Sequence, residues 1–151
     1  MAEVKSTQTT SVAAGTKLLP HESAGLRKSF YARFVNGAST LAVGDTIYLG
    51  DLPKGVRISK DWLANCGTGT ASSTLDIGLR TKSTGTVIDA DGIAASVNTA
   101  AAGYKDANTG ALIAAGAEYV TADVAEVYAT VTGAVFAASQ ALTVEGTYVS
   151  N

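Results

Sequence analysis

The residues that could carry acid, base or nucleophile chemistry are few in this sequence. His21 is the single histidine and stands beside Pro20 and Glu22, while Cys66 is the single cysteine. A catalytic triad needs a histidine ring that is rigidly oriented by hydrogen bonds, and a reactive thiol needs a neighbouring base that lowers its pKa. No such partners are recognisable, and the carboxylates show no spacing typical of a glycosidase pair. We therefore expect no catalytic residue and no enzyme, and we interpret Cys66 as a small, half-buried side chain.

The motifs for metal and cofactor binding are incomplete. Asp89, Asp91 and Gly92 resemble the start of an EF-hand loop, but Ile93 and Ala100 occupy the fifth and twelfth positions, where that loop needs oxygen ligands. A plain turn is the simpler interpretation. The short G-x-G run at 67–69 lacks the third glycine of a dinucleotide-binding loop. With one His and one Cys, a Cys/His metal cluster and an internal disulfide are excluded as well. We expect neither a metal nor a cofactor.

Small residues dominate the composition. Ala, Thr, Gly and Ser make up 74 of the 151 residues, while 46% of the chain is hydrophobic and the formal net charge is −2. This combination predicts one folded domain rather than a disordered chain. Ala and Gly bury little apolar area, so the large side chains must supply the core. We expect Trp62, Phe30, Phe34 and Phe136 to do so.

Charge is distributed unevenly along the chain. Residues 1–82 carry ten of the eleven Lys and Arg residues against six acids, and residues 83–151 carry Lys105 against seven acids. Two interpretations stay open: a basic face and an acidic face suited to oriented docking, or two halves that interleave in the fold. The acidic pI, near 5.3, argues against a nucleic-acid binder. No apolar stretch reaches the length of a membrane span or of a secretory signal, so we expect a protein made in a cytoplasm.

The chain divides into an arm at 1–27 and a β domain at 28–151. The arm has few large apolar residues and no sustained period. From Lys28 onward, alternating apolar residues predict a strand at 28–35 and others near 45–49, 56–62, 74–80, 86–88, 124–131 and 142–149, with a Gly/Ser/Thr loop at 65–73. Residues 91–102 are open between a short helix and a loop. About eight short strands and little helix predict an all-β fold, a jelly-roll-like antiparallel β-sandwich with an extended N-terminal arm.

Several segments of this pattern resemble a known family. They are 44–58 (GDTIYLGDLPKGVRI), the loop leading into 73–78 (STLDIG), the Ala-rich segment 100–104 (AAAGY) and 142–148 (LTVEGTY). In their order they resemble the decoration, or cement, proteins of tailed-bacteriophage capsids. The resemblance implies a jelly-roll sandwich without catalytic residues, located on the outer surface of the virion. It also implies symmetric homo-oligomers, such as dimers or trimers on symmetry axes, and contacts with the major capsid protein that stabilise the shell.

Two sets of residues are candidates for these contacts. The basic residues at the junction of arm and domain could dock onto an acidic patch of a partner, and outward tyrosines are common in interfaces. The candidates for capsid contact are Leu18, Leu19, Pro20, Arg27, Lys28 and Arg33. The candidates for oligomer or surface contact are Tyr31, Tyr48, Tyr104 and Tyr128.

An alternative function is a carbohydrate- or receptor-binding β-sandwich of a phage fibre or adhesin. Its aromatic residues would then form a platform for a sugar. The exposure of Trp62 separates the two hypotheses, because a solvent-facing Trp62 beside two tyrosines would favour the alternative.

Overall fold

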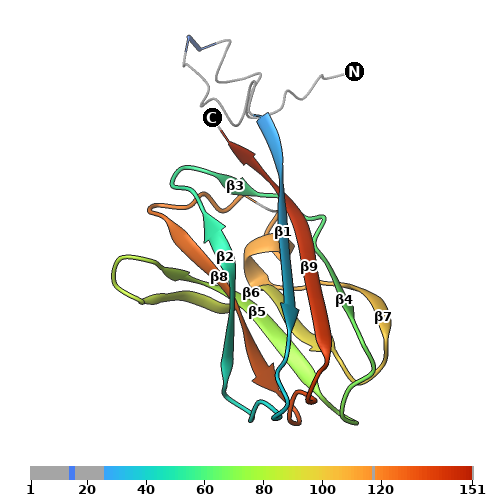
Figure 1. Ribbon diagram of the computed structural model, residues 1–151. Helices are drawn as coiled ribbons and strands as arrows, with labels where there is room; N and C mark the ends of the chain where they lie inside the picture. The colour runs from blue at the N-terminus through green and yellow to red at the C-terminus, as the bar shows by residue number, and fades with distance from the viewer. Residues whose placement is uncertain (1–13, 16–25, 117, 151) are drawn as a thin grey trace, which may run out of the picture.

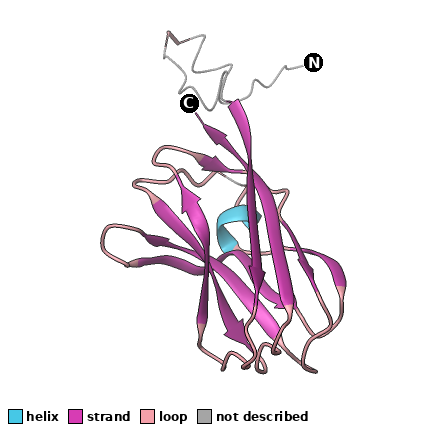
Figure 2. Ribbon diagram, in the orientation of Figure 1, coloured by secondary structure: helices cyan, strands magenta, loops and turns pink. Residues whose placement is uncertain are grey.

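The computed structural model describes residues 14–15, 26–116 and 118–150. These residues form two antiparallel β-sheets packed face to face (Figure 1). The elements are β1 Leu26–Val35, β2 Thr46–Leu52, β3 Arg57–Ile58, β4 Leu63–Cys66, β5 Thr74–Thr81, β6 Val87–Asn98, β7 Gly103–Asp106, α3 Ala111–Ala114, β8 Ala125–Thr132 and β9 Ala141–Ser150. In this part of the chain α3 is the single helix, four residues long (Figure 2).

The strand order is that of a jelly roll. The first sheet runs β1-β9-β4-β7, with β3 also paired to β9, and the second runs β2-β8-β5-β6. The chain crosses from one sheet to the other six times, between β1 and β2, β2 and β3, β4 and β5, β6 and β7, β7 and β8, and β8 and β9, so each sheet is assembled from strands far apart in sequence. The predicted jelly-roll-like sandwich is confirmed.

The first strand begins earlier than the sequence indicates. Leu26 pairs with Ser150 and Arg27 with Val149, so β1 starts two residues before Lys28. The predicted alternation within it is confirmed, because Phe30 is 7% exposed while its neighbour Tyr31 is 64% exposed. The arm predicted at 1–27 otherwise lies outside the described residues, except for 14–15.

The core lies between the two sheets and is built from the residues that the alternation indicates. On β5, Leu75, Ile77 and Leu79 are fully buried, and Val127 and Val131 of the adjacent strand β8 lie beside them on the same face of the sheet. The four aromatic side chains also pack as expected: Trp62, Phe136 and Phe30 are buried, and Phe34 packs half-buried against the core. These large residues offset the small apolar area of the Ala-rich strands.

The largest difference from the sequence prediction is β6. Most of residues 91–102 form neither the short helix nor the loop that the sequence left open. Instead, β6 extends along β5 as far as Asn98. Its pairing shifts register at three places. At one irregularity the carboxylate of Asp76 accepts a hydrogen bond from the backbone N–H of Ser96 at 2.7 Å, and Ser96 has a φ of 52°. Such bulges break the period-two pattern by which strands are found in a sequence.

One further prediction changes. Asn65 and Cys66, assigned to the loop at 65–73, belong to β4 and pair with Thr143 and Leu142 of β9.

Of the two interpretations of the uneven charge, the strand pairing supports interleaving of the two halves, since β1 pairs with β9 and β2 with β8. In the described residues no helix is long and apolar enough to cross a membrane.

Candidate interaction surfaces

The predicted basic cluster is not compact. Arg27 and Lys28 lie at the start of β1, whereas Arg33 lies six residues further along the same strand. At about 3.3 Å per residue, Arg33 is about 20 Å away. The other predicted capsid contacts, at positions 18–20, lie outside the described residues.

A different group of cations surrounds Arg27. Arg27 and Arg57 flank Val149 from the two strands on either side of β9. Lys82 lies at the same end, where β5 ends and its backbone N–H donates to the carbonyl oxygen of Val124. Figure 1 shows β3, the start of β1 and the end of β9 together at this end of the sandwich. We call it the basic end; it comprises Arg27, Lys28, Lys54, Arg57, Lys60 and Lys82.

Four acids lie at the basic end: Asp51, Asp61, Asp123 beside the Val124 carbonyl that bonds to Lys82, and Glu118 beside the Tyr119 carbonyl that bonds to Ile58. Two of them form ion pairs with its cations. Asp61 forms an ion pair with Arg27 and accepts a hydrogen bond from the hydroxyl of Thr147 at 2.9 Å. Partial burial raises the pKa of Asp61, but the hydrogen bonds from Thr147 and Arg27 outweigh it, so the net effect lowers the pKa. Asp51 forms an ion pair with Lys82. Both pairs are at least partly exposed to solvent, so each contributes little to stability.

Three lysines of the basic end remain available for a partner. Lys28, Lys54 and Lys60 are exposed and form no ion pair within the described part of the chain. Lys54 and Lys60 stand in the connections on either side of β3. The sequence prediction missed them because they are scattered over loops, and only the pairing of β3 with β9 brings them beside the start of β1.

The four tyrosines predicted as surface contacts separate into two groups. Tyr31, Tyr48 and Tyr104 are 64%, 53% and 67% exposed. Tyr128 is only 4% exposed, because the guanidinium of Arg80 lies over its ring at 5.1 Å. Tyr128 points out of the sheet as its place in the alternation indicates, but the long side chain of Arg80 covers it, so it is not an exposed contact surface. Tyr31 and Tyr104 lie on β1 and β7, the two outer strands of the first sheet.

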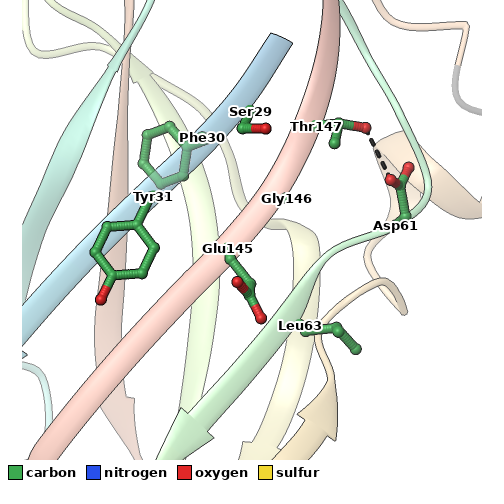
Figure 3. A pocket seen from close by; sticks show the side chains of 8 residues that line it. All are labelled: Ser29, Phe30, Tyr31, Asp61, Leu63, Glu145, Gly146 and Thr147. Atoms are coloured by element: carbon green, nitrogen blue, oxygen red, sulfur yellow. Dashed lines mark hydrogen bonds between the residues drawn. The ribbon is translucent and has the colours of Figure 1, made fainter. Parts of the chain in front are cut away.

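A hollow of about 300 Å³ opens on the outer face of the first sheet, between β1, β9 and the start of β4 (Figure 3). Strand register places the side chains of its rim. Tyr31, Glu145 and Leu63 lie opposite one another in one row across the three strands. Ser29 and Thr147 form a parallel second row, continued by the Asp61 carboxylate.

Phe30 and Gly146 lie at the floor of the hollow, directly opposite each other on β1 and β9. Trp62 packs beneath them, with its ring centroid 5.1 Å from that of Phe30. A Cβ atom on residue 146 would lie 2.3 Å from the indole ring of Trp62, so the close packing requires glycine. The buried Trp62 Nε1 has no hydrogen-bond partner among the described residues. The floor is therefore held by aromatic packing, and Trp62 itself does not face solvent.

The residues considered for chemistry are not brought together. Cys66 is 5% exposed, and Lys105 beside it donates to the carbonyl oxygens of Ala101 and Gly103. Partial burial, followed by a hydrogen bond with Asp91, raises the pKa of Asp89. The described residues contain no group of three or more His, Cys, Asp or Glu side chains that could hold a metal ion. His21 lies outside them.

Comparisons with known proteins give a structural result. No protein-family model matches the chain, and no curated protein matches its sequence. A chain in the capsid of Ralstonia phage GP4 is similar in structure, with a TM-score of 0.66 and 18% identity over 85% of this chain and 86% of that one. A chain in the capsid asymmetric unit of cyanophage Pam1 has a TM-score of 0.58 and 15% identity over the whole of both chains. At these identities the shared property is the fold.

Proposed function

We propose that this chain is a structural virion protein that decorates the outer surface of a tailed-phage capsid and stabilises the shell. The observation that carries the proposal is the jelly-roll sandwich, which the chain shares over most or all of its length with chains of two phage capsids. The described residues expose several tyrosines and contain no group of three or more His, Cys, Asp or Glu side chains that could hold a metal ion. Both observations agree with a role in binding.

The basic end supplies a chemical reason for docking. It lies where β1 begins, so the preceding residues 1–25 enter the domain there. Exposed lysines without ion-pair partners attract an acidic surface, and complementary charge orients the docking protein. In this proposal the arm and the basic end together bridge neighbouring subunits of the major capsid protein by non-covalent contacts.

Association between copies is the second part of the proposal. Strands rich in small residues store little hydrophobic energy, so a dimer or trimer on a symmetry axis of the shell would bury additional surface. Tyr104 on the first sheet and Tyr48 on the second are exposed aromatic contacts for such an interface. Multi-angle light scattering of the free protein and of a Tyr104→Ser variant tests this part. A monomer at every concentration contradicts it.

Co-sedimentation with undecorated heads tests the docking proposal. The double variant Lys54→Glu, Lys60→Glu should bind at least tenfold more weakly than the natural chain, and added salt should reduce the difference by screening. Arg33→Glu is the matched control for a charge reversal at the other end of β1. Equal binding by the double variant and the natural chain would remove the basic end from the mechanism. An equal loss in both variants would extend the contact along β1 to Arg33.

The carbohydrate-binding alternative depended on an exposed tryptophan. Trp62 is 0% exposed and lies between Phe30 and the backbone of Gly146. An aromatic platform that uses Trp62 is therefore absent, which favours decoration of a shell as the principal function.

A further inference from the structure

The hollow on the outer face of the first sheet combines apolar walls with a carboxylate, and the proposed docking through the basic end does not use these residues. One side carries the ring of Tyr31, 64% exposed, and the other carries Leu63, 37% exposed. Between them stands Glu145, opposite both in strand register. Neighbouring side chains on adjacent strands lie about 5 Å apart at Cβ. One carboxylate therefore stands between two apolar walls.

The polar atoms of the hollow differ in their availability. The hydroxyl of Thr147 is committed, because it donates to Asp61 and accepts from the Nε–H of Arg27 at 3.0 Å. Glu145 forms no ion pair or side-chain hydrogen bond within the described part of the chain, and Ser29 forms no side-chain hydrogen bond there. The available groups are thus a carboxylate, which accepts hydrogen bonds, and a hydroxyl, which donates and accepts them.

We propose that this hollow binds a saccharide, with the Tyr31 ring against the apolar C–H face of a pyranose and the Glu145 carboxylate accepting hydrogen bonds from two adjacent sugar hydroxyls. A pyranose presents both features at once: a patch of C–H groups and a rim of hydroxyls. Hydrogen bonds to a carboxylate are the stronger, charge-assisted kind. Ser29 is placed to bond a further hydroxyl. The volume of about 300 Å³ is at the lower end for small-molecule sites and suits one or two sugar rings.

The site is preformed. Its walls belong to three paired strands, and its floor is fixed by the packing of Phe30 on Trp62 beneath Gly146. A rigid site loses little conformational freedom on binding, which lowers the free-energy cost of binding a small ligand. Tyr31 is exposed and Glu145 half-buried, and each stands between inward-facing neighbours on its strand, so both can be replaced without disturbing the core.

Saturation-transfer difference NMR with the full chain tests the proposal. The probes are a panel of neutral monosaccharides and disaccharides, with glycerol as a small polyol without a ring and arginine amide as a cationic probe. We expect at least one saccharide to bind with millimolar affinity, and both Glu145→Gln and Tyr31→Ala to weaken it at least tenfold. The control Val87→Ala shortens an exposed apolar side chain on β6, outside the hollow, and should bind as the natural chain does.

Three results would overturn the proposal: no saccharide of the panel binds, binding survives both variants unchanged, or arginine amide alone binds. Thermal melting of each variant confirms that loss of binding is not loss of folding. The proposal is independent of shell decoration. Co-sedimentation of the Glu145→Gln variant with undecorated heads distinguishes saccharide binding from docking to the shell. A variant that no longer binds the saccharide but still binds heads has lost only the saccharide site.

Discussion

Trp62 carries more of the core than any other single residue in the described structure. It is the largest fully buried side chain there, and it packs on Phe30 and on the backbone of Gly146. Truncation of a buried aromatic residue leaves a cavity and costs about 3–5 kcal/mol. Because a domain of this size is stable by only about 5–15 kcal/mol, Trp62→Ala should remove a large part of its stability.

Urea denaturation measures this prediction. The midpoint should fall strongly for Trp62→Ala and less for Trp62→Phe, which keeps an aromatic ring and removes the unpartnered indole N–H. Val43→Ala, at a 56% exposed residue, should change the free energy of unfolding by less than about 0.5 kcal/mol. Equal midpoints for Trp62→Ala and the natural chain would contradict the central place of Trp62 in the core.

Asp89 makes stability depend on pH. Its pKa in the folded state is raised by burial first and by the hydrogen bond with Asp91 second, so folding disfavours the charged form. The resulting destabilisation is absent below the unfolded-state pKa, near 3.8, and grows as the pH rises through the folded-state pKa. Asp89→Asn should therefore raise the melting temperature at pH 7 and leave it nearly unchanged at pH 3. A variant that melts lower than the natural chain at pH 7 would contradict this assignment.

At the residue scale, alternation along a strand was a good guide to burial but did not identify the neighbours of each side chain. The inward positions of Leu75, Ile77 and Leu79 followed from their spacing. The burial of Tyr128 did not, because it depends on Arg80 from the adjacent strand β5. Glu145 was likewise unremarkable in the sequence, and only its register opposite Tyr31 places it in a hollow.

At the scale of elements, β1 defines where the folded domain begins. Its pairing with β9 starts at Leu26, and Arg27 forms an ion pair with Asp61. A deletion made at the predicted boundary, residues 1–27, would remove both. Deletion of residues 1–25 should preserve the sandwich, since its first core side chain is Phe30.

The deletion of residues 1–25 should leave the melting temperature within about 2 °C, because a change of 1 kcal/mol shifts it by about 2–8 °C in domains of this size range. It should weaken binding to undecorated heads at least tenfold, since the arm is a proposed shell contact. Calorimetry and co-sedimentation measure the two effects separately. Full-strength binding by the shortened chain would exclude the arm from the mechanism.

The elements that the sequence predicted poorly share a physical cause. Bulges interrupt the period of β6, and β4 is a four-residue strand whose Asn65 and Cys66 lead into a run of turn residues. Local sequence patterns could not predict the strand pairing, because β1 pairs with β9 more than one hundred residues away. Local patterns report which residues face inward, whereas the order of strands in a sheet depends on long-range packing.

At the scale of the whole molecule, the crossovers between the two sheets bring cationic residues from distant parts of the sequence to one end of the sandwich. The two halves of the chain interleave, and yet six cations meet at the end where β1 begins. The halves therefore interleave without spreading the cations evenly over the fold. The basic end is the surface through which we expect the protein to meet an acidic shell, and the outer face of the first sheet carries the hollow.

The rupture temperature of capsids tests the central claim most directly. Purified protein is added in increasing amounts to undecorated tailed-phage heads filled with DNA, and the release of DNA is followed by dye fluorescence on heating. Many copies, each adding a modest interface, should raise the rupture temperature in proportion to occupancy until the sites are filled. A rupture temperature that stays constant while the protein is bound would contradict a stabilising role.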